Sequence, residues 1–176
     1  AENAYAQAES AILSFRRQLR EEAAEILRRT EEQGKFAVVL AGRPYHTDPF
    51  VSHSLSEMFT RKGIPVLTVD SLPGLEETDL RQSRVEITND FHARMLSGAL
   101  VTAAIPALEY VQIVSFGCGH DAILSDELIR ILGESGKPPL VLKMDESRAS
   151  GSLGIRVQSF LETVQLRRNR QQDAPP

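Results

Sequence analysis

The chemically most capable side chain of this sequence is its single cysteine, Cys118. It lies in the segment 115–121, which reads SFGCGHD, directly after an apolar run at 110–114 and before a helical pattern that begins at Ala122. A thiol between two glycines at a strand-to-helix turn is placed to contact a group outside the fold. Such a thiol can act as a nucleophile or as a metal ligand.

A second segment with reactive side chains lies about 70 residues earlier. Residues 42–48 read GRPYHTD and follow another short apolar run, at 36–41. Tyr45, His46 and Asp48 supply a phenol, an imidazole and a carboxylate, the groups that orient ligands and move protons.

Three functions of Cys118 are consistent with these residues. As a nucleophile, it would gain acidity from the start of the following helix, with His46 or His120 as the base. As an iron–sulfur ligand, it would supply one thiolate, and a cubane would need three more from elsewhere. Alternatively, the two loops hold an anion through backbone N–H groups, although neither has the spacing of a phosphate-binding or dinucleotide-binding loop. A zinc site is not expected, because one cysteine with scattered histidines lacks a ligand spacing.

The pattern around these loops predicts alternating strands and helices. Short apolar runs typical of strands buried on both faces alternate with segments of helical periodicity. The predicted strands are 36–41, 64–69, 110–114 and 140–144, and the predicted helices are 4–32, 52–62, 86–104, 122–132 and 154–167.

This alternation predicts an α/β fold of three layers, with helices on both faces of a parallel sheet. We expect four strands in the order 2-1-3-4, of the flavodoxin-like or Rossmann-like kind, preceded by a long amphipathic helix. Ligands of such sheets bind where the strand order reverses, here between the first and third strands. The two loops would therefore meet, and the residues expected to line their shared cleft are Tyr45, His46, Asp48, Gly117, Gly119 and Asp121.

Length and composition narrow the class of protein. The 176 residues suffice for one domain, which we divide into a helix at 1–34, an α/β domain at 35–168 and a frayed tail at 169–176. A net charge of −4 argues against a general nucleic-acid or membrane binder. A single cysteine fits a reducing cytoplasm, the expected location.

Three segments together resemble a known family. They are VLAGRPYHTDP at 39–49, SFGCGHD at 115–121, and LKMDE at 142–146 with GIRV at 154–157. In this order they resemble the C-terminal part of 2-hydroxyacyl-CoA dehydratase activase-related proteins. Relatives of that family are the cluster-bearing subunits of 2-hydroxyacyl-CoA dehydratases, benzoyl-CoA reductases and double-cubane cluster proteins. The similarity runs from the first helix to about Val164.

The resemblance implies ATP-driven electron transfer at low potential through an iron–sulfur cluster, of which a 4Fe–4S cubane is the expected type. It makes Cys118 a cluster ligand and places Tyr45, His46 and Asp48 in the same cleft. The family's ATPase belongs to an actin-like domain that these residues do not match, so no ATP hydrolysis is assigned.

The missing cysteines lead us to expect a domain excised from a longer protein. By itself the fragment would be inactive and would lack the cluster. Its expected partners are other domains of the parent chain or an activase or dehydratase subunit, and a homo-oligomer is also open.

Overall fold

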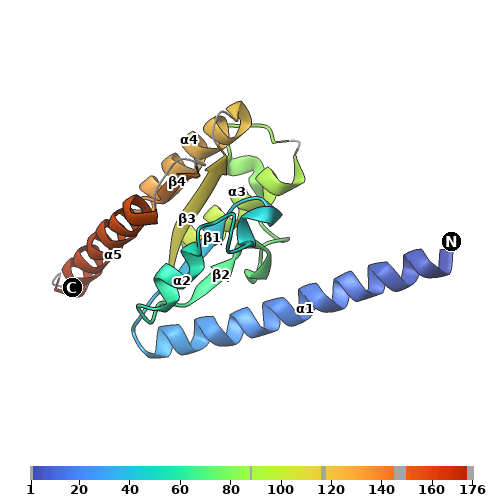
Figure 1. Cartoon of the computed structure of the whole chain (residues 1–176), viewed down its shortest axis with the longest axis horizontal. Helices are drawn as coiled ribbons and strands as arrows, with labels where there is room; N and C mark the ends of the chain where they lie inside the picture. Colours follow the sequence, from blue (N-terminus) through green and yellow to red (C-terminus); the bar gives the residue numbers. More distant parts are fainter. Residues whose placement is uncertain (1, 88, 116–117, 145–149, 174–176) are drawn as a thin grey trace.

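The computed structural model describes residues 2–87, 89–115, 118–144 and 150–173. Its centre is a parallel sheet of four strands in the order β2-β1-β3-β4 (Figure 1). The strands are β1 (Ala37–Ala41), β2 (Val66–Thr68), β3 (Leu108–Ser115) and β4 (Leu140–Met144). The helices are α1 (Glu2–Glu32), α2 (Leu55–Thr60), α3 (Asp90–Ala104), α4 (Gly119–Glu134) and α5 (Ser150–Asp173). The predicted fold class and strand order are confirmed.

Successive side chains of a strand point to opposite faces of the sheet. The apolar strands therefore present apolar side chains on both faces, and helices cover each face. Val39 and Tyr110 belong to the apolar core that includes residues of α3, α4 and α1. Val38 and Val111 belong to the second core, with residues of α2 and α5. This burial on both faces explains why β1 reads as an uninterrupted apolar run, since all five of its residues are buried.

Several boundaries differ from the sequence prediction. The helix predicted at 52–62 is the shorter α2, because His53 and Ser54 adopt positive φ angles of 50° and 54° just before it. The strand predicted at 64–69 shortens to β2 and runs into a 3-10 turn, η2 (Val69–Ser71). At the other end, α5 continues to Asp173, so residues 169–173 of the expected tail are helical.

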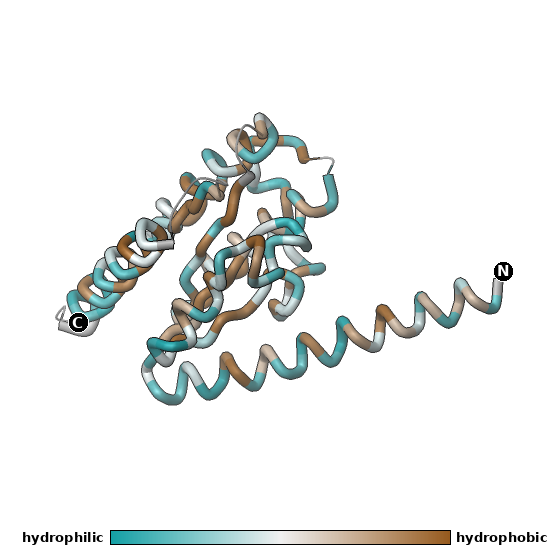
Figure 2. The backbone as a smooth tube through the Cα atoms, in the orientation of Figure 1, coloured by the Kyte–Doolittle hydropathy of each residue, from teal (hydrophilic) through white to brown (hydrophobic). Residues whose placement is uncertain are grey.

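Helix α1 packs on the domain through its second half only. Ala23 and Leu27 are buried in the core, and the helix contacts η2. It ends before Gly34, whose φ of 64° reverses the chain toward β1. The first half extends away from the body as an arm (Figures 1 and 2).

The pairing of β1 with β3 brings two distant loops to one edge. Leu40 pairs with Val111, and Ala41 pairs with Gln112. Both strands run in the same direction, so the loop after β1 and the segment after β3 leave the sheet at its carboxyl edge.

A buried ion pair ties α5 to the opposite end of β3. Glu109 is 1% exposed, and Arg167 of α5 donates a hydrogen bond to its carboxylate. A carboxylate this deep is tolerated only with a charged partner, because removing the partner leaves an uncompensated buried charge.

We therefore predict that Arg167→Met lowers the free energy of unfolding by about 3–5 kcal/mol. The double variant Glu109→Gln/Arg167→Met should lose less, because neither member of the buried pair remains charged. Arg170→Met, at an exposed position of the same helix, is the control. Urea unfolding measures all three, and equal losses in the single and double variants would contradict the ion-pair argument.

Candidate functional site

The carboxyl edge of the sheet carries a polar cluster centred on Arg43. Its guanidinium donates hydrogen bonds to the Cys118 Sγ at 3.1 Å and to the Asp121 Oδ1 at 2.9 Å. A third bond, at 3.4 Å, reaches the Tyr45 hydroxyl. One side chain from the loop after β1 thus joins the start of α4, and the predicted meeting of the two loops is observed.

Asp121 is the buried anion of this cluster. It is 3% exposed and forms an ion pair with Arg43. The His92 Nε2 lies 3.1 Å from the same oxygen, Oδ1. Burial disfavours the charged guanidinium, but the hydrogen bonds to Cys118 and Tyr45 and the charge of Asp121 together raise the pKa of Arg43. The guanidinium therefore stays charged.

Cys118 is the N-cap residue of α4, with extended backbone angles and a partly exposed side chain. Its sulfur therefore sits at the positive end of the helix and accepts a hydrogen bond from a cation. The helix start and the Arg43 guanidinium both favour a negatively charged group bound at the sulfur. The sulfur keeps further lone pairs, so this hydrogen bond leaves it able to bind a metal.

His46 belongs to the loop after β1, and its side chain is buried. The Arg43 backbone N–H donates to its Nδ1 at 3.0 Å, which requires Nδ1 to be unprotonated. Burial lowers the pKa of His46, the charge of Asp121 opposes this shift, and the charge of Arg43 adds to it. The ring also explains Gly42, because a Cβ there would come within 2.6 Å of Nδ1.

The other predicted site residues have different surroundings. The Tyr45 ring is about half exposed and stands edge-on to His46, with centroids 4.4 Å apart. Asp48 accepts hydrogen bonds from the backbone N–H groups of Phe50 and Val51, so it stabilises its own turn. Gly119 begins α4 beside open space.

Two further predictions have different outcomes. His120 is exposed, with its ring edge-on to His92 at 6.1 Å between centroids. Among the contacts described, neither His46 nor His120 is a hydrogen-bond partner of the Cys118 sulfur. Gly117 lies outside the described residues.

Arg43 and His92 belong to the cluster but were not among the predicted site residues. Arg43 stands inside the predicted loop 42–48, of which only Tyr45, His46 and Asp48 were expected to line the cleft. His92 is in the first turn of α3. The signal for it is topological, because a crossover helix that follows a parallel strand begins at the carboxyl edge of the sheet.

The cluster fits a single metal ligand and not a complete metal site. Within the described part of the chain, no three His, Cys, Asp or Glu side chains are grouped so as to hold a metal ion. The sequence contains one cysteine. An iron–sulfur cubane with four thiolates does not fit this chain alone, although one of its ligands could come from Cys118.

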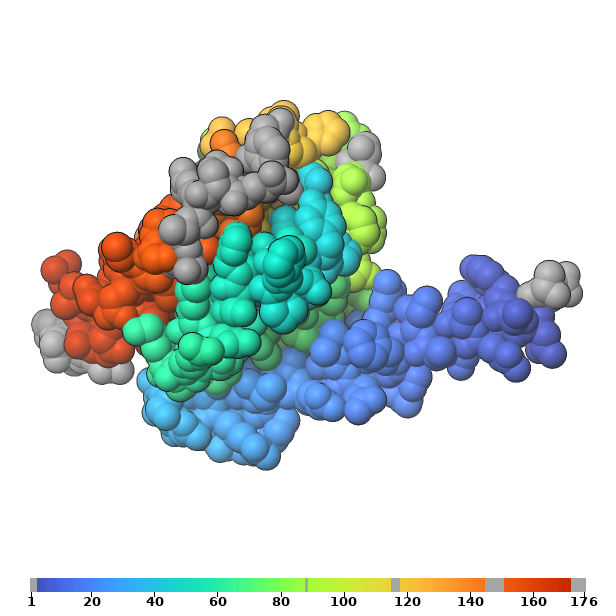
Figure 3. Space-filling view, viewed as in Figure 1, coloured from blue at the N-terminus to red at the C-terminus, as the bar shows by residue number. Residues whose placement is uncertain are grey.

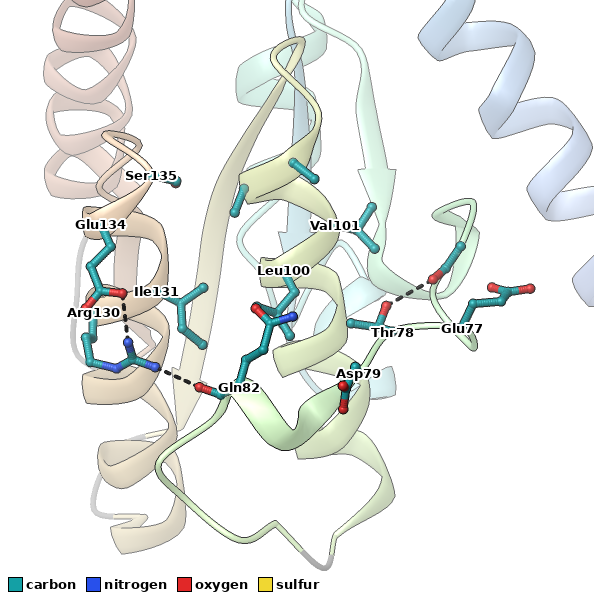
Figure 4. Close-up of a pocket in the computed structure, with 13 residues that line it drawn as sticks. Glu77, Thr78, Asp79, Gln82, Leu100, Val101, Arg130, Ile131, Glu134 and Ser135 are labelled. Atoms are coloured by element: carbon teal, nitrogen blue, oxygen red, sulfur yellow. Dashed lines mark hydrogen bonds and ion pairs between the residues drawn. The ribbon is translucent and has the colours of Figure 1, made fainter.

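A separate hollow of about 690 Å³ lies between the segment 74–82 and the helices α3 and α4 (Figure 4). Two of its charged groups pair with each other. Arg130 pairs with Glu134 at 2.8 Å and donates to the Gln82 carbonyl at 3.3 Å. None of the predicted site residues lines this hollow, so it is a surface feature apart from the Arg43 cluster.

Comparison with known proteins supports a relation to CoA enzyme activases. Residues 1–72 match the family described as the CoA enzyme activase uncharacterised domain. The matched part includes α1, β1, the Arg43 loop, α2 and β2. The match is consistent with the resemblance to activase-related proteins that the sequence motifs indicate. No curated protein and no solved structure matches the chain significantly. Within the described residues, no helix combines the length and apolar character needed to cross a membrane.

The buried His46 predicts a pH-dependent stability. Its folded-state pKa lies below the ordinary value of 6.5, so the unfolded chain binds more protons as the pH falls through that value. The free energy of unfolding should therefore decrease from pH 7.5 to pH 5. His46→Asn keeps an acceptor near the Arg43 N–H and does not titrate, so it should flatten this decrease.

His53→Asn serves as the matched control, because asparagine tolerates the positive φ of that position. Unfolding measured in urea at several pH values should give the wild-type slope for this variant. A slope unchanged in His46→Asn would contradict the assignment.

Proposed function

We propose that this chain is an α/β module of an activase-related iron–sulfur protein, in which Cys118 supplies one ligand to a cluster. The remaining ligands come from other domains of the same protein or from a partner subunit. Such a cluster supplies one-electron transfer at low potential. The module contributes one thiolate and the charged surroundings that hold it.

The observation that carries this proposal is the environment of the sulfur. Cys118 is partly exposed at the carboxyl edge of the sheet, where α/β folds bind ligands. It accepts a hydrogen bond from a guanidinium that is itself fixed by the buried Asp121. A metal-bound thiolate is anionic, and hydrogen bonds to the sulfur and nearby charge are the means by which proteins tune a cluster.

Arg43 and His92 act as positioning residues in this proposal. The ion pair with Asp121 keeps Arg43 against the sulfur, and His92 contacts the same oxygen of Asp121. The thiol therefore has a fixed neighbour on one side and a partly exposed side on which another domain could place a cluster. Tyr45, about half exposed next to Arg43, would flank that domain.

The thiol-enzyme alternative has less support. A nucleophilic cysteine needs a base within hydrogen-bond reach or a thiolate stabilised by positive charge. Arg43 and the start of α4 meet the second condition, but a guanidinium cannot accept a proton and so is no general base. Of the two candidate bases, His46 uses its Nδ1 to accept from the Arg43 backbone, and among the contacts described neither His46 nor His120 is hydrogen-bonded to the sulfur.

Reconstitution with iron and sulfide under anaerobic conditions tests the ligand assignment. It uses the longest natural protein that contains this sequence, together with its partner subunits. Cys118→Ser should reduce the iron bound from about four per cubane to about three or fewer, because one of four thiolates is lost. Iron and sulfide analysis and visible absorption are the measurements.

Ala122→Ser is the matched control, one helical turn further along the exposed side of α4. It should bind the same amount of iron as the wild type. Equal iron content and absorption in the wild type and Cys118→Ser would overturn the assignment.

A further inference from the structure

The arm of α1 carries an apolar seam that continues beyond the body of the domain. Its residues recur every three or four positions and lie on one side of the helix: Tyr5, Ala8, Ile12, Phe15, Leu19, Ala23 and Leu27. Ala23 and Leu27 are buried against the domain. The same seam then extends outward, where Tyr5, Ile12 and Phe15 are 71%, 53% and 64% exposed.

A helical arm that packs against nothing is only marginally stable in water. Isolated helices of this length are marginal in water, and most helix stability comes from packing an apolar face. The space-filling view shows the first half of α1 projecting from the body (Figure 3). Large apolar side chains gathered on such a projection mark an interaction surface. The continuity with the buried seam indicates that a helix-packing surface is extended here.

We infer that the arm pairs with the α1 arm of a second copy of this chain, antiparallel across a two-fold axis. The spacing of three and four residues is that of a coiled-coil seam. In the register that we propose, Ile12 packs against Phe15 of the partner subunit, and Ala8 packs against Leu19 of the partner subunit. Two large side chains meet in each central layer of the seam, a small one faces a large one in each layer outside these, and the two bodies lie at opposite ends of the pair.

The charge of the arm selects this orientation. Residues 1–15 contain two acidic residues and no basic residue, whereas 16–20 contain three arginines and no acidic residue. Antiparallel pairing places the acidic stretch of one copy beside the basic stretch of the other. Glu9 and Arg16 both flank the seam, so in this register Glu9 lies beside Arg16 of the partner subunit. A parallel pair would instead place like charges side by side.

Sedimentation equilibrium of the 176-residue chain tests the pairing. At about 100 μM the wild type should have twice the chain mass of 19.5 kDa, since association follows mass action. Ile12→Glu/Phe15→Glu should sediment as a monomer. Ser10→Glu/Ser14→Glu adds the same charge away from the seam and should remain a dimer. A monomeric wild type, or equal association of both variants, would overturn the inference.

Disulfide trapping tests the orientation on a Cys118→Ser background. One preparation carries Ala8→Cys and another carries Leu19→Cys, and the two are mixed and oxidised. The proposed register gives a mixed disulfide between them. Self-linked dimers within each preparation would indicate a parallel pair and overturn it. A cysteine that links instead to another segment of a longer natural chain would identify a different occupant, with the same consequence.

Discussion

The parallel pairing of β1 with β3 is the constraint on which the site depends. It aligns Ala41 with Gln112, so the chain leaves both strands at the same edge. Residues 75 positions apart are thereby brought within hydrogen-bond distance, as the Arg43–Cys118 contact shows. If β3 lay elsewhere in the sheet, the arginine and the sulfur would lie too far apart for a hydrogen bond, and the cluster would not form.

The buried Asp121 fixes the position of the Arg43 guanidinium at this edge of the sheet. A carboxylate that is 3% exposed requires partners, and Arg43 and His92 approach it from two different segments of the chain. Burying a charge pair is costly, and its gain is specificity more than stability. Here the specific result is that the guanidinium faces the sulfur. The position of Cys118 at the start of α4 then adds the helix dipole on the same atom.

The fold was predictable to the extent that local patterns decide it. Uninterrupted apolar strands separated by helices required a doubly covered parallel sheet, and the long connection between the second and third strands indicated the order. The boundaries of α2 were less predictable, because no glycine or asparagine marks the two positions, His53 and Ser54, that adopt positive φ angles. The extension of α5 to Asp173 follows from helix-favouring residues that were read as a tail.

The site was predictable as a location and less so as a set of contacts. The meeting of the loops followed from topology, but the sequence could not distinguish Asp48, which stabilises its own turn, from Asp121, which accepts from Arg43 and His92. Both are aspartates near a strand end. The difference arises because Asp121 lies in the first turn of α4 and is covered by α3, whereas Asp48 remains exposed. Which of the two carboxylates requires charged partners depends on burial, and burial is known only from the packed structure.

The family match covers one part of this cluster and does not include the cysteine. Residues 1–72 include Arg43, Tyr45 and His46 but end before Cys118 and Asp121. The match therefore relates α1, β1, β2 and the Arg43 loop to the CoA enzyme activase domain, while the case for the sulfur rests on its own contacts. Those contacts place one fixed cation against the sulfur, and the Cys118 side chain remains partly exposed. Under the proposed function, the other thiolates of the cluster come from another domain or subunit, which is why the ligand assignment is tested in the assembled protein.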